Sequence, residues 1–173
     1  MIDRKKKILH TALDLFANEG FKSVPTSKIA KHAEVSEGLI FRHFENKQGL
    51  LNALIQEASE KVNTLFTPIL LQTDAKMVIQ KTIELPFSVS KNEYPFWKLQ
   101  FKLKWENDYD GSDKMEPLIV KLAWAFKVLG YEEPRKEAEI LNHIIESIST
   151  GILRDSVKSQ IGLKDFLIHK YLK

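Results

Sequence analysis

The sequence contains no cysteine among its 173 residues. That absence excludes disulfide bonds, thiolate catalysis and zinc sites built on cysteine. The sequence also lacks any run of 18 uncharged apolar residues, so we expect no membrane-spanning helix. The basic start MIDRKKKILH leads into TALDLFANEGF, where Asp14 and Glu19 make the segment amphipathic and unlike a signal peptide. These features predict a cytoplasmic protein.

Sequence motifs of common enzyme classes are missing as well. No GxGxxG or P-loop pattern occurs, and Ser147 and Ser149 do not belong to a glycine-rich nucleophile elbow. Glu139, His143 and Glu146 share a helical face, but no second ligand-rich segment accompanies them, and such a trio is more often a polar seam in a helix bundle. We therefore predict that the chain is not an enzyme and that it has no catalytic residues, no metal and no cofactor.

What is present is an ordinary globular composition. Hydrophobic residues make up 43% of the chain and charged residues 28%, so disorder is not expected. The formal net charge of +3 permits an acidic partner without requiring one. The length fits one domain, or a small domain fused to a larger one, and the sequence has no internal repeat.

Apolar residues follow a helical period along almost the whole chain, which predicts an all-α protein. Gly20 is placed to end the first helix, Ser36 and Asn46 are placed to cap later ones, and Pro86 is expected to kink or end its helix. After the first amphipathic segment, helices are expected over residues 26–33, from 36, and over 47–66, 74–90, 94–107, 113–130, 135–158 and 163–172.

One window is ambiguous, because WKLQFKLKW alternates apolar and polar residues as a strand does. Trp97, Phe101 and Trp105 in this window also have the four-residue spacing of a helix. A lone strand would have no partner elsewhere in the chain, so we predict a helix.

Two short helices joined by a tight turn, after a longer amphipathic helix, make a helix-turn-helix pattern. Ala30 allows the second short helix to cross closely, Val35 fills the turn, and Ile40 and Phe44 anchor the second helix. Phe41 is expected, like Phe44, to be a core residue. The outward face of the second helix then carries Ser36, Glu37, Gly38, Leu39, Arg42 and His43.

The stretch IAKHAEVSEGLIFRHFENKQGLL resembles the DNA-binding core of the TetR/AcrR family of bacterial transcriptional regulators. The resemblance covers residues 5–55 closely. It implies a helix-turn-helix DNA-binding domain over residues 1–46 and a helical ligand-binding and dimerisation domain over 47–173, with helix 47–66 linking the two. It implies phosphate contacts for Thr26, Ser27, His43 and Lys47, and base or neighbouring phosphate contacts for Ser36, Glu37, Gly38, Leu39 and Arg42.

The chain departs from the family pattern at several positions. Glu34 stands where the turn usually has glycine, which strains the backbone if φ is positive there. Phe41 replaces a tyrosine, and Val24-Pro25 stands where serine or threonine is common. Glu37 often appears as lysine; an acid is repelled by phosphate but accepts from a cytosine amino group. Fewer phosphate contacts predict weaker non-specific binding and a shallower salt dependence.

Two further sets of residues are predicted in the larger domain. Because ligand pockets are mostly apolar and aromatic, the candidates for lining one are Phe87, Trp97, Phe101, Trp105, Trp124 and His143. The expected ligand is a small apolar or aromatic molecule. Two helices, near 135–158 and 163–172, are the candidates for a two-fold dimer interface, with Ile140, Ile144, Ile148, Ile152 and Phe166 as its predicted residues.

These expectations combine into a homodimeric, ligand-released repressor that binds a palindromic operator in double-stranded DNA. The two recognition helices would then lie about 34–36 Å apart, one turn of DNA. Activation in place of repression stays open. So does the alternative of a helical protein-interaction module that has lost DNA binding, which Phe41 and Glu37 favour.

Overall fold

The computed structural model describes residues 3–105, 112–154, 160 and 162–172. Over these residues the chain is helical, and no strand occurs among them. The chain divides into two compact units, which we call unit 1 (residues 1–62 and 92–109) and unit 2 (residues 63–91 and 110–173). The division at residue 46 expected from the sequence was drawn by function and stays a prediction, whereas these two units are defined by packing.

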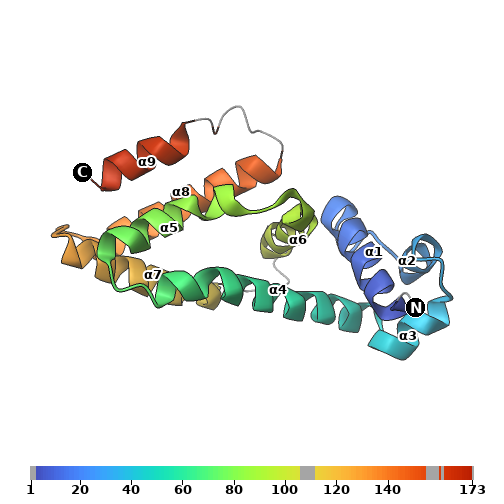
Figure 1. Ribbon diagram of the computed structural model, residues 1–173. Coiled ribbons are helices and arrows are strands. Elements are labelled where there is room, and N and C mark those ends of the chain that lie inside the picture. Colours follow the sequence, from blue (N-terminus) through green and yellow to red (C-terminus); the bar gives the residue numbers. More distant parts are fainter. Residues whose placement is uncertain (1–2, 106–111, 155–159, 161, 173) are drawn as a thin grey trace. The chain divides into compact units, whose positions relative to one another are not determined.

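Unit 1 begins with three helices, α1 (Arg4–Glu19), α2 (Thr26–His32) and α3 (Glu37–Phe44), drawn in blue to cyan in Figure 1. Asp3 caps α1 by accepting a 3.0 Å hydrogen bond from the Lys5 amide. At the other end the Gly20 amide donates to Phe16, with a φ of 89° at Gly20 that favours glycine. The predicted end of the first helix is therefore confirmed.

The turn between α2 and α3 contains the residue that replaces the family's glycine. Glu34 has a φ of 52°, in the region that side-chain-bearing residues rarely adopt. The Val35 amide closes the turn by donating to the Ala30 carbonyl over 3.0 Å. The positive φ at Glu34 is the condition under which the sequence predicted backbone strain at this residue.

The first helices share one core. Ile8, Phe16, Ile29 and Ile40 are fully buried, and the Phe16 and Phe21 rings meet edge to face at 5.3 Å. The interior of unit 1 therefore takes side chains from α1, α2 and α3 together, so each short helix is held by packing that it could not provide alone.

Helix α4 (Lys47–Leu70) follows α3, and the boundary between the two units falls within it after Val62. The Asn46 side chain accepts from the Gly49 amide over 2.8 Å, which confirms the predicted cap. A Cβ at Gly49 would lie only 2.0 Å from the Phe44 carbonyl oxygen, so the close approach of the α4 start to the α3 end needs glycine here.

The ambiguous window forms helix α6 (Tyr94–Trp105), as predicted, after a short 3-10 turn η1 (Lys91–Glu93). Its buried side chains Phe96, Leu99 and Leu103 lie on one helical face, and the two leucines belong to the core cluster of unit 1. Helix α6 packs against α1. This tertiary packing explains why an alternating pattern forms a helix.

Unit 2 contains α5 (Ala75–Ser88), α7 (Ser112–Val128), α8 (Pro134–Leu153) and α9 (Leu163–Tyr171). Helix α5 packs against the other three, and α7 packs most extensively against α8. The Phe126 ring is fully buried, with edge contacts to Tyr131 at 4.9 Å and Tyr171 at 5.6 Å. Burial raises the pKa of both tyrosines.

Two residues near the ends of α5 are informative, and only the second, Pro86, carried an expectation from the sequence. Asp74 caps α5 by accepting from the Met77 amide over 2.9 Å. Pro86 lies within α5, which continues for two residues beyond it to Ser88, so the proline stands in the last turn of the helix it was expected to kink or end. Across the described residues, no helix is both long and apolar enough to cross a membrane.

Candidate nucleic-acid interface

Apart from Leu39, the residues predicted to face DNA are polar or small, and all of them reach the surface of unit 1. Ser27, Ser36, Gly38, Arg42 and His43 are exposed. A Cβ added at Gly38 would meet nothing within 4 Å, so the start of α3 is open to a close approach by a ligand. Thr26, Glu37, Leu39 and Lys47 are half-buried. The structure therefore leaves the first turns and the outer face of α3 accessible.

A direct bond connects two of these predicted residues. The Thr26 hydroxyl, at the start of α2, donates a 2.5 Å hydrogen bond to the Glu37 carboxylate at the start of α3. A hydroxyl has a single proton to donate. While it is held by Glu37, Thr26 has no proton left for a phosphate oxygen. The predicted phosphate contact by Thr26 therefore competes with this bond.

A second link crosses from α1 to the turn. Lys7 Nζ donates a 2.5 Å hydrogen bond to the Glu34 carboxylate. The same ammonium holds the pKa of Glu34 below its usual value. Glu34 adopts the strained backbone of the turn, so Lys7 ties this turn to the first helix.

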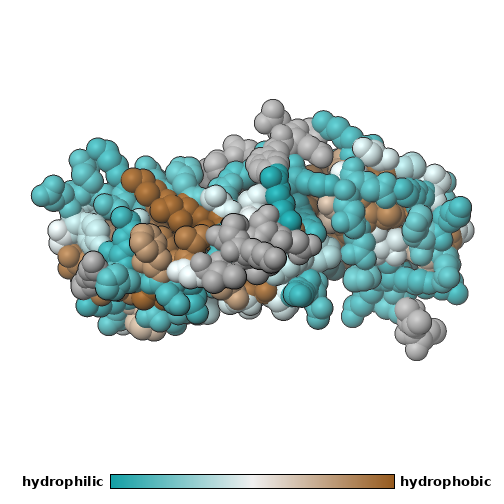
Figure 2. All heavy atoms as spheres, turned by 90° about the horizontal axis from the view of Figure 1, so that it is seen from above, coloured by the Kyte–Doolittle hydropathy of each residue, from teal (hydrophilic) through white to brown (hydrophobic). Residues whose placement is uncertain are grey.

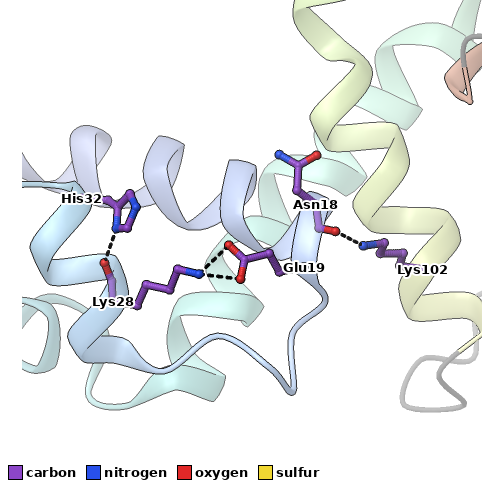
Figure 3. A network of polar contacts seen from close by, with 5 residues as sticks. All are labelled: Asn18, Glu19, Lys28, His32 and Lys102. Carbon is purple, nitrogen blue, oxygen red and sulfur yellow. Dashed lines mark hydrogen bonds and ion pairs between the residues drawn. The ribbon is translucent and has the colours of Figure 1, made fainter.

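The end of α1 is also fixed by polar contacts (Figure 3). Lys28 of α2 bonds both carboxylate oxygens of Glu19, at 2.7 and 2.5 Å, and Lys102 of α6 donates to the Asn18 carbonyl over 2.8 Å. His32 Nδ1 lies 2.9 Å from the Lys28 carbonyl oxygen. These contacts fix α2 and α6 to the same end of α1.

Lys47 was predicted to contact phosphate from the start of α4. Its ammonium lies 4.5 Å from the centre of the Phe21 ring and donates a long, 3.4 Å hydrogen bond to the Lys22 carbonyl. Burial lowers the pKa of Lys47. The ammonium is thus held near the base of the helix-turn-helix by two neutral groups, the Phe21 ring and the Lys22 carbonyl.

The expectation that Phe41 is a core residue is wrong. Phe44 is buried, but 44% of Phe41 is exposed. Phe41 has the four-residue spacing of Glu37 and Glu45, so it shares their side of α3, whereas Ile40 and Phe44 face inward. The spacing of Phe41 with these two acidic residues was the sequence signal for an exposed position. The aromatic side chain of Phe41 suggested the core instead.

Comparison with known proteins agrees with this geometry. The sequence pattern described as "Bacterial regulatory proteins, tetR family" matches residues 8–54, which span α1 to the start of α4. The chain carries a TetR-family DNA-binding domain. Its fold is accordingly an N-terminal helix-turn-helix domain followed by further helices.

Named relatives extend the similarity. The chain is 46% identical over 54 residues to the HTH-type transcriptional regulator YvkB of Bacillus subtilis, covering 31% of this chain and 29% of that protein. It is 27% identical over 165 residues to the HTH-type regulator YhgD of the same organism, covering 91% and 73%. A solved TetR-like regulator from Rhodococcus sp. RHA1 superposes with a TM-score of 0.82 at 18% identity, covering 98% of this chain and 95% of that one. Over residues 8–54 the chain is therefore similar to the helix-turn-helix domain of tetR-family regulators, and over its remaining length the similarity is one of fold.

The residues predicted to line a ligand pocket are distributed over both units. Trp97 and Phe101 lie half-buried on α6 in unit 1, whereas Phe87 is half-buried on α5 in unit 2. Trp124 and His143 of unit 2 are exposed, and Lys121 Nζ lies 4.3 Å from the centre of the Trp124 ring. The Trp105 side chain lies outside the described residues. The pocket stays a prediction.

The predicted dimer residues differ in exposure. Ile140 and Phe166 are 51% and 62% exposed, and Ile144 is half-buried. Ile148 and Ile152 are buried within unit 2, so a partner reaches them only if the unit rearranges. Figure 2 shows hydrophobic side chains, coloured brown, at the surface of unit 2 on the left of the picture.

Sequence reasoning also missed an apolar stripe on α7. Val120, Trp124 and Val128 are all exposed and recur every four residues, so they lie on one face of that helix. The regular spacing was visible in the sequence. It was overlooked because Trp124 was assigned to a pocket, and its spacing to the two valines was not considered.

Proposed function

We propose that this protein is a transcriptional regulator that binds a palindromic operator as a homodimer and is released from it by a small ligand. The main support for this proposal is the open outer face of α3, where Arg42, His43 and Ser36 are exposed beside Gly38. This face belongs to the segment that matches the tetR family. Arg42 is the residue best suited to a guanine, since a guanidinium forms two hydrogen bonds with its major-groove edge.

The direct test is selection of DNA by the purified protein. Fragmented genomic DNA is incubated with the full chain, and the retained fragments are sequenced. Enrichment of one short palindrome is the expected result. Retention without any common sequence, or no retention by a protein that is folded and dimeric, would contradict the proposal and favour the protein-interaction alternative.

The ligand part of the proposal is supported by one buried polar atom. Trp97 Nε1 on α6 is buried and has no hydrogen-bond acceptor among the described residues. A buried donor without an acceptor costs free energy. An acceptor on a bound aromatic or apolar ligand would remove that cost. Because α6 packs on α1 through Leu99 and Leu103, a ligand at Trp97 would act on a helix that contacts the DNA-binding helices.

Release requires a difference in ligand affinity between the DNA-bound and free states, typically about 1–3 kcal/mol. The test is a set of small aromatic compounds added to the protein on its selected operator. We expect at least one to raise the Kd for DNA in wild type and to do so less in Trp97→Phe, which keeps a smaller aromatic ring and lacks the N–H. An equal effect in both proteins would remove Trp97 from the site.

The dimer part is supported by the exposed Ile140 on α8 and Phe166 on α9. Large apolar side chains on a surface mark contact sites when they gather. A two-fold dimer would use each of them twice, because the same patch meets its own copy. Ile144, half-buried on α8 four residues from Ile140, continues that face.

A further inference from the structure

The bond between Thr26 and Glu37 bears on which bases the protein reads. Glu37 stands at the start of α3, next to the exposed residues Ser36 and Gly38. Its partner Thr26 is a neutral hydroxyl on a neighbouring helix. The carboxylate is therefore held in place by a neutral group, and one of its oxygens already accepts a hydrogen bond from the Thr26 hydroxyl.

An acid on this surface is unfavourable unless DNA offers it a donor. A carboxylate is only an acceptor, so it repels phosphate oxygens and the acceptor edges of bases. Phe41, one turn along α3 and also exposed, brings no cation to offset the charge. A DNA sequence that presents an amino group to the Glu37 carboxylate is therefore bound more tightly than one that does not.

Two bases present an amino group in the major groove, cytosine at N4 and adenine at N6. Adenine carries the N7 acceptor beside its amino group, and a carboxylate would approach that nitrogen too. Cytosine has no second acceptor on this edge. The chemistry of Glu37 therefore fits cytosine better than adenine.

We propose that Glu37 is a specificity-determining residue that accepts a hydrogen bond from a cytosine amino group, and that Thr26 is the residue that positions its carboxylate. This inference rests on the proposed DNA binding and adds to it one base preference per recognition helix. Thr26 acts through Glu37, so the hydroxyl makes a sequence-dependent contribution without contacting a base.

The test uses the operator selected by the wild-type protein and all single base-pair changes of it. Wild type is expected to prefer C·G at one position of each half-site by roughly tenfold in affinity, within the range of a good base contact. Glu37→Gln should move that preference to A·T, because an amide pairs with both N6 and N7 of adenine. Thr26→Val, nearly isosteric, should weaken the preference for cytosine there and leave preferences at other positions unchanged.

Glu34→Gln is the matched control, because Glu34 is also an acid bound by a side chain from another helix, Lys7. It should leave every base preference as in wild type. Thermal unfolding of each variant identifies a loss of fold, and Glu37→Gln carries the test if Thr26→Val does not fold.

The outcomes separate this inference from the proposed function. If wild type selects no sequence, the proposed function fails and this inference fails with it. If wild type selects an operator and Glu37→Gln selects the same bases at every position, only this inference is overturned, and Glu37 is a structural tie between α2 and α3.

Discussion

The two units differ in what they leave on their surfaces. In unit 1 the single large hydrophobic side chain exposed among the described residues is Phe41. The corresponding side chains of unit 2 come from four helices or their ends, namely Leu71, Val120, Trp124, Val128, Ile140 and Phe166. A charged, polar surface suits a phosphate backbone and base edges, whereas an apolar surface suits another protein surface. The two surfaces therefore suit different classes of partner.

Polar contacts between separate helices occur in both units. In unit 1 Lys7 joins α1 to the turn and Thr26 joins α2 to α3. In unit 2 Arg135 of α8 bonds Glu116 on α7 and also Glu139 on its own helix. The units therefore differ in their exposed apolar side chains and share this kind of polar contact.

The largest expected effect comes from emptying each core. Phe16→Ala in unit 1 and Phe126→Ala in unit 2 remove fully buried rings, and each should lower the free energy of unfolding by about 3–5 kcal/mol. Urea unfolding followed by circular dichroism measures the loss. Leu71→Ala, at an exposed position, should change stability by less than about 0.5 kcal/mol. Equal losses for Leu71 and the two phenylalanines would contradict the assigned cores.

The apolar surface of unit 2 gives the next effect. Ile140→Asp places a charge on the proposed interface and should raise the dimer Kd at least about tenfold, corresponding to 1.4 kcal/mol. Analytical ultracentrifugation measures the association. Leu71→Asp is the control, because it introduces the same charge at another exposed apolar position, and it should leave the dimer intact. Dimers unaffected by Ile140→Asp would move the interface elsewhere, the α7 stripe being the next candidate.

The polar surface of unit 1 should respond in DNA binding without a change in assembly. Arg42→Ala is expected to weaken binding to the selected operator by about 1–3 kcal/mol if the guanidinium makes a bidentate guanine contact. Fluorescence anisotropy with labelled operator measures this. Lys127→Ala removes one exposed positive charge from unit 2 and serves as the matched control. Equal affinities for wild type and Arg42→Ala would take Arg42 off the interface.

The smallest effect is a difference in how the units respond to alkali. Burial raises the pKa of Tyr131 and Tyr171 above the ordinary 10.0, so their stabilising contribution is complete below pH 10 and is lost as the pH rises through the raised values. Burial lowers the pKa of Lys47 below 10.5, so unit 1 gains stability between the lowered value and 10.5.

Thermal unfolding at pH 8 to 11 tests this contrast. The melting temperature of wild type should fall more steeply above pH 10 than that of Tyr131→Phe, which has one group fewer to ionise. Lys47→Met should remove the gain in unit 1. Parallel curves for wild type and Tyr131→Phe would show that Tyr131 does not contribute to the alkaline loss.

Much of the helical fold was predictable because its signals are local. Gly20, Asn46 and the period of the apolar residues act within one or two turns, and the structure follows each of them. The family of residues 8–54 was recognisable for the same reason, since the turn and its flanking helices are continuous in sequence. The site residues proposed for DNA, ligand and dimer stay predictions, although the structure shows which of them are exposed.

Other features depended on contacts between distant residues. Whether Phe41 faced the core or solvent depended on how α3 packs, and an aromatic residue suits either place. Ile148 and Ile152 belong to the same apolar series as Ile140, and only the neighbouring helices separate buried members from exposed ones. The bond from Thr26 to Glu37 spans two helices, and no short-range pattern encodes it.

The amino-acid sequence was thus sufficient for the helices, for the helix ends at Gly20 and Asn46 and for the family of residues 8–54, because hydrogen-bonded turns and apolar periodicity arise between residues close in the chain. Ser36, expected to cap α3, makes no side-chain cap bond there. Only the tertiary structure decided which face of each helix remains exposed, how α6 joins the core of the first unit, and which polar side chains hold one another. Those properties depend on burial and on distances between segments far apart in sequence, where composition and spacing carry little information.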